Sequence, residues 1–240
     1  LAVHSERYGD KIFEWISDKM FIHNFSEIKT GLAKIDFQRL SATSRAKYDF
    51  YRGMCCLKVD GQPQEAIDIF HRILNHEVAF EHLYHLTWCR FGFAESYHQL
   101  GKTEMRDFFL NMAMESLRQA NAAKRATLVQ RTNLAIEIID FYFRINQLKQ
   151  TLELLEQTLG QLDKCQSSYK IDALHHYQAR VHYRQGDLLK GHSKMYFSYL
   201  ATERTGNVEL RNQILRNHGD LITLIQELFA KDQRQSIWDI

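Results

Sequence analysis

Histidine and cysteine are the residues of this sequence that could bind a metal or act as a nucleophile and its base. The chain has 12 histidines and 4 cysteines. His82 and His85 are one helical turn apart, and His175, His176 and His182 fall in one expected helix. Zinc needs three or four converging ligands, and neither an H-E-x-x-H motif nor a C-x-x-C pair is present. We therefore expect no metal, no catalytic residue and no cofactor, with reduced and buried cysteines.

Other signals for catalysis or nucleic-acid binding are also missing from the sequence. It contains no G-x-x-x-x-G-K-[ST], no G-x-G-x-x-G and no G-x-S-x-G motif. Glu27, Glu65 and Glu153 are typical of solvated helix faces, and the basic segment 124–131 is too short for a nucleic-acid stripe. The formal net charge is only +2, and no apolar run approaches the roughly 18 residues of a membrane span. These observations predict a cytoplasmic protein that is neither an enzyme nor a membrane protein.

A repeated pattern of two helices positions the polar and aromatic side chains. Each unit has a helical run rich in aromatic and small residues, then a short polar turn, then a second amphipathic run. The turns of four units align at Gly61, Gly101, Asn146 and Gly186, which gives steps of 40, 45 and 40 residues. Glycine and asparagine tolerate the left-handed backbone that often ends a helix, so we expect a helix C-cap at each turn.

A fainter first unit and a final helix extend this pattern at both ends. The first unit turns at His23 and Asn24, and the last segment has a broad apolar face that suits a capping helix. The expected units span about 8–36, 44–76, 84–118, 128–162 and 170–203, with the capping helix at about 207–232. The chain has one proline and no strand-like alternation, so it is predicted to be all-α.

The residues inside each unit resemble the tetratricopeptide (TPR) repeat, which combines small residues, an aromatic residue and a turn glycine at fixed positions. The matching residues are Gly61, Ala66 and Phe70 in the second unit, Ala94, Tyr97, Gly101 and Ala113 in the third, Tyr142 and Leu148 in the fourth, and Ala179, Gly186, Leu188 and Gly191 in the fifth. The departures are Arg106, Ile139, Thr151 and His182. The resemblance implies one domain over residues 1–240, a right-handed solenoid of about five degenerate TPR-like helix pairs with a C-terminal capping helix.

In a TPR-like solenoid, the first helices of the pairs line a concave face that binds extended peptides. Carried over by position, the resemblance implies a peptide groove lined by Tyr51, Trp88, Phe91, Glu95, Asn133, Asp140, Phe143, Arg144, His176, Arg180 and Tyr183. In this groove Asn133 would bond a peptide backbone unit, and Arg180 or Arg144 would hold a carboxylate. Trp88, Phe91 and Phe143 would form apolar pockets, and Glu95 or Asp140 would select a basic residue.

The longer units leave an alternative for these groove residues. If the phase of the repeat is shifted, the aromatic residues are core residues and Arg144 with Asp140 is a plain i, i+4 helix pair.

The architecture resembles the repeat domain of the peptide-pheromone sensors of Gram-positive bacteria, a group that includes the PlcR, PrgX, Rgg and NprR regulators and the Rap phosphatases. In the regulators, a helix-turn-helix domain precedes the repeats. None precedes Tyr8 here and the chain begins without methionine, so we expect a fragment. The resemblance implies the peptide-binding domain of a quorum-sensing transcriptional regulator, with DNA contacted only through a domain outside this chain.

Two other functions compete with the sensor, and the last helix bears on assembly. A generic TPR adaptor would dock another protein without a small effector, and a phosphatase-type regulator would need an N-terminal bundle for which the residues before Tyr48 leave little room. The last helix carries Leu221, Ile222, Leu224, Ile225, Leu228 and Phe229, more apolar surface than one packing face consumes. We therefore expect a homodimer that uses this helix.

Overall fold

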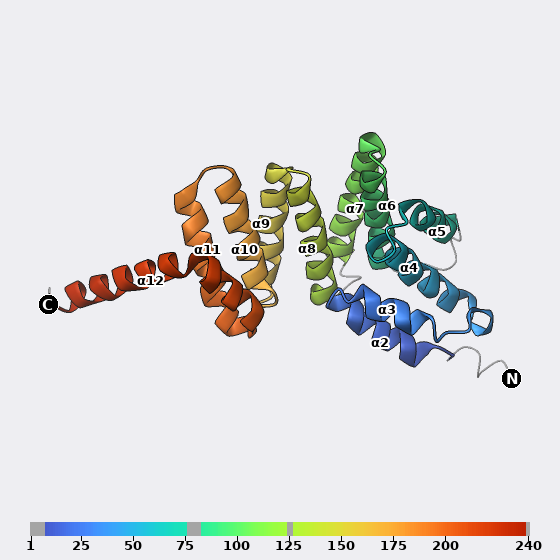
Figure 1. The fold of residues 1–240 in the computed structure, drawn as a ribbon, viewed down its shortest axis with the longest axis horizontal. Coiled ribbons are helices and arrows are strands. Elements are labelled where there is room, and N and C mark those ends of the chain that lie inside the picture. Colours follow the sequence, from blue (N-terminus) through green and yellow to red (C-terminus); the bar gives the residue numbers. More distant parts are fainter. Residues whose placement is uncertain (1–7, 76–82, 124–126, 239–240) are drawn as a thin grey trace. The chain divides into compact units, whose positions relative to one another are not determined.

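The computed structural model describes residues 8–75, 83–123 and 127–238 (Figure 1). Helices account for 84% of the described residues, and this part of the chain contains no strand. The all-α prediction is therefore confirmed. The chain divides into two compact units, Leu1–Leu134 and Ala135–Ile240, and the boundary falls inside helix α8 (Leu128–Arg144).

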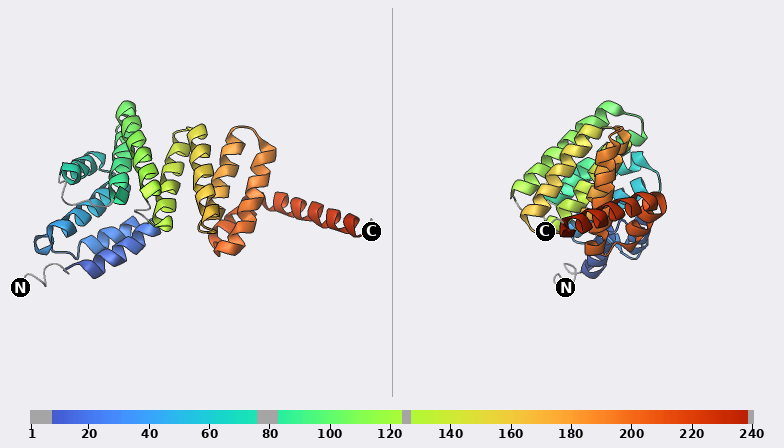
Figure 2. Two further views of the ribbon diagram at one scale, coloured as in Figure 1. Left: turned by 180° about the vertical axis from the view of Figure 1, so that it is seen from behind. Right: turned by 90° about the vertical axis from the view of Figure 1, so that its left-hand side faces the viewer.

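The first unit contains three consecutive helix pairs and the start of α8. Its α-helices are α2 (Asp10–Phe21), α3 (Phe25–Leu32), α4 (Ala42–Lys58), α5 (Pro63–Asn75), α6 (Leu83–Gln99) and α7 (Thr103–Ala123). A short 3-10 helix, η1 (Phe37–Arg39), connects the first two pairs. Within each pair the two helices pack on each other, as α6 and α7 show most clearly (Figures 1 and 2).

The second unit continues from α8 through four further helices. These are α9 (Leu148–Lys164), α10 (Ile171–Arg184), α11 (Leu188–Thr205) and α12 (Val208–Trp238). The bounds of the helix pairs and of α12 lie close to those expected for the two-helix repeats and for the last helix. The right-handed TPR-like solenoid that would join the pairs stays a prediction.

Every expected turn has the left-handed backbone that ends a helix. The φ angles are 56° at His23, 61° at Gly61, 69° at Gly101, 60° at Asn146 and 78° at Gly186. In four of these turns the next residue donates its N–H to a carbonyl five residues earlier, as Lys102 does to Tyr97 at 2.9 Å. This is the Schellman arrangement, which satisfies carbonyls that the end of a helix would leave unbonded. The predicted C-caps are therefore confirmed.

Small residues let bulky rings fit between the helices of the first unit. Phe70 of α5 is fully buried between Gly53 of α4 and Gly92 of α6. A Cβ atom would lie 2.6 Å from the Phe70 ring at Gly53 and 2.5 Å from it at Gly92, closer than packed atoms approach. Both glycines are thus required by tertiary packing within helices, where glycine is otherwise unfavourable.

Helix α12 covers the last helix pair with its first half. Ile214 and Ile222 are each 1% exposed and pack in one cluster with Ala179 of α10 and Met195 of α11. The backbone between them departs from helical geometry at His218, where φ is −140°. Beyond Ile222 the helix extends away from α10 and α11 (Figures 1 and 2). Within the described residues, no helix is both long and apolar enough to cross a membrane.

Candidate functional site

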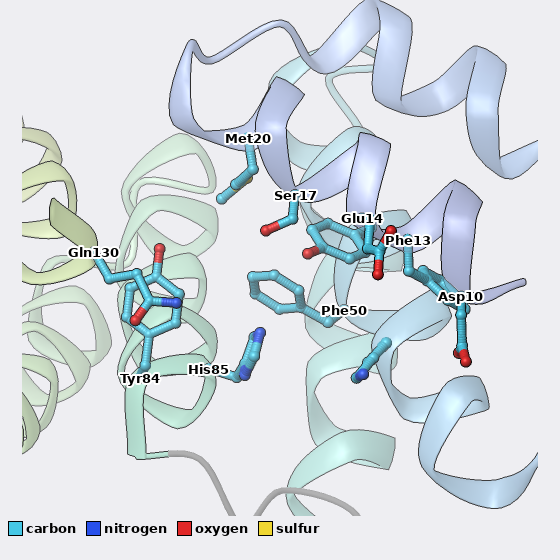
Figure 3. Close-up of a pocket in the computed structure, with 11 residues that line it drawn as sticks. Asp10, Phe13, Glu14, Ser17, Met20, Phe50, Tyr84, His85 and Gln130 are labelled. Atoms are coloured by element: carbon cyan, nitrogen blue, oxygen red, sulfur yellow. The ribbon is translucent and has the colours of Figure 1, made fainter. Parts of the chain in front are cut away.

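A pocket of about 390 Å³ opens in the first unit, among the first helices of successive pairs (Figure 3). Its walls come from α2, α4, α6 and the start of α8. The residues that line it are Asp10, Phe13, Glu14, Ser17, Met20, Lys47, Phe50, Tyr51, Tyr84, His85 and Gln130. This volume lies toward the lower end of the range for ligand pockets, roughly 300–1,000 Å³.

Helix α2 contributes one face to this pocket. Its five lining residues lie at positions i, i+3, i+4, i+7 and i+10, a pattern that places side chains on the same side of a helix. Phe13 and Met20 are buried on this face, whereas Asp10 and Glu14 are exposed. Ser17 and Met20 point from α2 toward the side of the pocket that holds Phe50 and Tyr84 (Figure 3). The wall from α2 therefore combines an apolar base with an acidic rim.

Aromatic rings from three helices form the apolar part of the pocket. Phe50, Tyr51 and Tyr84 are 1%, 5% and 8% exposed. The Phe13 ring stacks on Tyr51 at 6.4 Å, and His85 meets the edge of Phe50 at 5.3 Å. Burial raises the pKa of Tyr51, although a hydrogen bond with Ser17 acts in the opposite direction. The Tyr51 hydroxyl therefore stays protonated near neutral pH and can still donate or accept a hydrogen bond.

Three charged side chains line the same pocket. In the described part of the chain, Asp10, Glu14 and Lys47 form no ion pair or side-chain hydrogen bond with one another or with other residues. Gln130 accepts a hydrogen bond from the Thr127 backbone N–H at 2.9 Å, which places its amide at the start of α8. The pocket thus presents two carboxylates, one ammonium and one amide around aromatic rings.

Of the residues expected to line the peptide groove, those in the first compact unit, Leu1–Leu134, are mostly buried. Tyr51 lines the pocket, but Trp88 and Phe91 are 1% and 0% exposed and belong to the core. Glu95 is 4% exposed and pairs with Lys58 at 2.6 Å, and Asn133 is 2% exposed. Trp88 and Phe91 therefore lie in the core, as the alternative hypothesis of a shifted repeat phase predicted.

The second unit brings four of the expected residues together. Asp140, Phe143 and Arg144 of α8 lie beside Arg180 of α10. Asp140 accepts hydrogen bonds of 2.8 Å from Arg144 Nε and from the Tyr177 hydroxyl. The Arg180 guanidinium lies 4.3 Å from the centre of the Phe143 ring. Arg144 and Asp140 do form an i, i+4 pair, and the contacts with α10 extend that pair into a larger cluster.

Two further residues complete this cluster. Tyr177 and Arg184 of α10 both contact Phe143, Tyr177 with its ring at 6.2 Å and Arg184 with its guanidinium at 3.7 Å. Burial raises the pKa of Tyr177 far above its usual range, and so does the adjacent carboxylate of Asp140. Their spacing from Arg180, at three and four positions, was the signal in the sequence that could have identified them.

His176 and Tyr183 of α10 are part-buried beside α11 and α12. Burial lowers the pKa of His176 to about 4, assisted by the charge of Arg180 and by His218. Tyr183 stacks on His218 at 5.7 Å and meets His192 at 5.6 Å. Tyr183 therefore takes part in the contacts that hold α12 on the second unit, and His176 lies near enough to His218 of α12 for their charges to interact.

Ten of the eleven pocket residues were not expected from the sequence, and half of these ten lie on α2. Phe13 and Met20 follow the apolar spacing of a helix, but groove positions were expected only in the helix pairs from residue 44 onward. The signal was the polar set Asp10, Glu14 and Ser17, which shares the helical face of Phe13. A rim of short polar residues beside aromatic positions is a pattern that a ligand site also shows.

Histidine, cysteine and carboxylate side chains were the candidates for metal binding and nucleophilic chemistry. No group of three or more His, Cys, Asp or Glu side chains is placed to hold a metal ion among the described residues. Cys55, Cys56 and Cys89 are buried as free thiols, and Cys165 is exposed. Burial raises the pKa of Cys55 to about 12, so its thiol is a poor nucleophile near neutral pH.

The sequence matches no protein-family model, and neither curated proteins nor solved structures gave a match.

Proposed function

We propose that the pocket of the first unit binds a short linear peptide. The observation that carries this proposal is the lining itself, in which aromatic rings from α2, α4 and α6 surround a space bordered by Asp10, Glu14 and Lys47. Peptide sites typically anchor an apolar side chain in such a space and use a few polar groups to orient the backbone. A volume near 390 Å³ suits one or two side chains rather than a folded partner.

The charges in the lining suggest which peptides would fit. Asp10 and Glu14 are one turn apart on α2 and would hold an ammonium or guanidinium group. Lys47 on α4 would bond a backbone carbonyl or a carboxylate of the same peptide. The proposed ligand therefore has a large apolar side chain next to a basic residue or a free N-terminus.

We further propose that this domain is the sensing part of a cytoplasmic quorum-sensing transcriptional regulator that responds to such a peptide as a homodimer. Support comes from the series of helix pairs, their left-handed turns and the position of the pocket on the first helices of the pairs. DNA would be contacted by a domain outside this chain. The generic TPR adaptor differs from this function in its ligand, which would be a protein segment and not a small secreted peptide.

Binding of fluorescently labelled peptides to the full chain tests the proposal. The probes are heptapeptides selected from a random display library and the short secreted peptides encoded beside the gene. Saturable binding at micromolar concentration or below would support a peptide site, and binding of a peptide encoded beside the gene would support the sensor over the adaptor. If no heptapeptide binds, the proposed pocket function is wrong.

Variants at the rim of the pocket link any binding to this site. Glu14→Gln and Lys47→Gln should each weaken binding about fivefold, as expected for loss of roughly 1 kcal/mol from an exposed charged contact. Both residues lie at least partly in solvent, so the melting temperature should change little. Glu104→Gln, at an exposed carboxylate on α7, is the matched control and should leave affinity unchanged. Equal affinities in all three variants would place the peptide elsewhere.

A further inference from the structure

Two guanidinium groups of the second unit lie on one aromatic ring. The guanidinium carbons of Arg180 and Arg184 are 4.3 and 3.7 Å from the centre of the Phe143 ring. Arg180 also lies 5.2 Å from the ring of Tyr177. Phe143 is only 2% exposed, so its ring is a fixed support for both cations. Two like charges that share one ring repel each other, and a bound anion would offset this repulsion.

The carboxylate in this cluster is already occupied by other donors. Asp140 receives the Tyr177 hydroxyl on one oxygen and Arg144 Nε on the other. Arg184 gives one N–H to the backbone carbonyl of Phe143 at 2.7 Å, close to the C-terminal end of α8. Arg180 forms no ion pair or hydrogen bond with any residue of the described chain. The pair of stacked arginines therefore carries positive charge that the described residues do not neutralise directly.

Stacking leaves the hydrogen-bonding edge of a guanidinium available. A guanidinium that meets a ring with its flat face keeps the N–H bonds in its plane for other partners, and Arg184 uses one of them on the Phe143 carbonyl. The ring also restricts the side chain before any ligand arrives, which lowers the entropy lost on binding. A planar donor group held in this way suits two oxygen atoms of one anion.

We propose that Arg180 and Arg184 form a binding site for an oxyanion, either a carboxylate or a phosphate. The anion would bridge the two guanidinium groups and remove their mutual repulsion. This site lies wholly in the second unit and does not rest on the peptide pocket of the first. If the bound group is a carboxylate, the C-terminus of a peptide is one source of it. If the bound group is a phosphate, it comes from a phosphoryl group.

Titration of the full chain with small anions tests this site. The probes are inorganic phosphate and N-acetylglycine, with N-acetylglycinamide as the uncharged counterpart and sodium chloride to keep ionic strength constant. The Arg Nε–H resonances in NMR spectra report binding at individual arginines. Saturable shifts of the Arg180 and Arg184 signals are expected with at least one anion and not with the amide. The anion that binds more tightly identifies the chemistry.

Substitutions at Arg180 separate a directed site from general attraction of anions. Arg180→Gln should weaken binding about tenfold, which corresponds to the loss of one charge-assisted hydrogen-bonded contact of about 1.4 kcal/mol. Arg180→Lys keeps the charge but loses the planar pair of donors, so it should weaken binding as well. Arg118→Lys, on an exposed face of α7, is the matched control and should bind as the original chain does.

Two results would overturn the proposal even if the anions shift the arginine signals. The first is that chloride alone reproduces the shifts, and the second is that Arg180→Gln binds the anions as well as the unchanged chain while its circular dichroism shows a folded protein. If the anions bind but no heptapeptide does, the oxyanion site stands and the peptide function is wrong. If peptides bind and the anions do not, the proposed oxyanion site is wrong and the peptide function stands.

Discussion

Acidification is expected to destabilise the second unit through His176 of α10. Burial, the charge of Arg180 and the neighbouring His218 lower the pKa of this imidazole from 6.5 to about 4, against the opposing charge of Asp172. The unfolded chain therefore takes up a proton at His176 below about pH 6.5, whereas the folded unit resists protonation until about pH 4. The stability that depends on the neutral imidazole is complete above pH 6.5 and is lost as the pH falls through this window.

The two pKa values set the size of the effect. Each pH unit between them is worth about 1.36 kcal/mol, so the free energy of unfolding should fall by roughly 3 kcal/mol between pH 6.5 and pH 4. Other groups also titrate in this range, and His176→Gln isolates the contribution of His176 because glutamine is polar but does not titrate. Relative to the unchanged chain, this variant should gain roughly 3 kcal/mol on going from pH 7 to pH 4.

Hydrogen exchange on peptides that cover α10 measures this change within the second unit. His71→Gln, at an exposed histidine of α5 in the first unit, is the matched control and should leave the exchange of α10 unchanged at both pH values. If His176→Gln and the unchanged chain lose protection of α10 by the same amount at pH 4, His176 is not the group responsible and the argument from its burial fails.

Three further predictions concern packing and assembly. Gly92→Ala should destabilise the first unit by roughly 1–3 kcal/mol because its Cβ would meet the Phe70 ring. Gly160→Ala on α9, where a Cβ would have no neighbour within 4 Å, should instead stabilise the protein by up to about 1 kcal/mol. Urea denaturation measures both changes. Asn133→Ala should lower stability by about 1–3 kcal/mol, because a buried amide is removed, and should leave peptide affinity unchanged; an unchanged melting temperature would contradict its interior placement. Light scattering should show that the wild-type protein is a dimer and that Leu224→Glu converts it to a monomer, since Leu224 is 54% exposed on α12. A monomeric wild-type protein would refute this assembly.

The turns show how much of the fold could be predicted from local sequence. Gly61, Gly101 and Gly186 adopt positive φ angles, and so does Asn146, because the end of a helix favours a residue without a steric penalty in the left-handed region. Helix spans followed from the same local information. The spacing of Phe13, Ile16 and Met20 in α2, for example, identifies one buried face of a helix.

The candidate site was harder to predict because its helices differ in how far they are buried. In α6, every residue from Phe91 to Tyr97 is buried, including the polar Glu95 and Ser96. A helix covered on all sides has no polar face, so its sequence does not show which side lines a groove. The groove positions assigned to Trp88 and Phe91 therefore lie in the core. Helix α2 is amphipathic, but its polar positions look the same in sequence whether they face solvent or a pocket, so no groove position was assigned to it.

The amino-acid sequence by itself determined the helical class, the order of the helix pairs and the position of each turn, because these depend on neighbouring residues and on the period of the helix. Tertiary structure alone decided which side chains meet. The contact of Phe70 with Gly53 and Gly92 joins three helices, and the stacking of Arg180 and Arg184 on Phe143 joins α8 to α10. Contacts of this kind depend on how helices distant in sequence pack, and no local pattern of residue types specifies that arrangement.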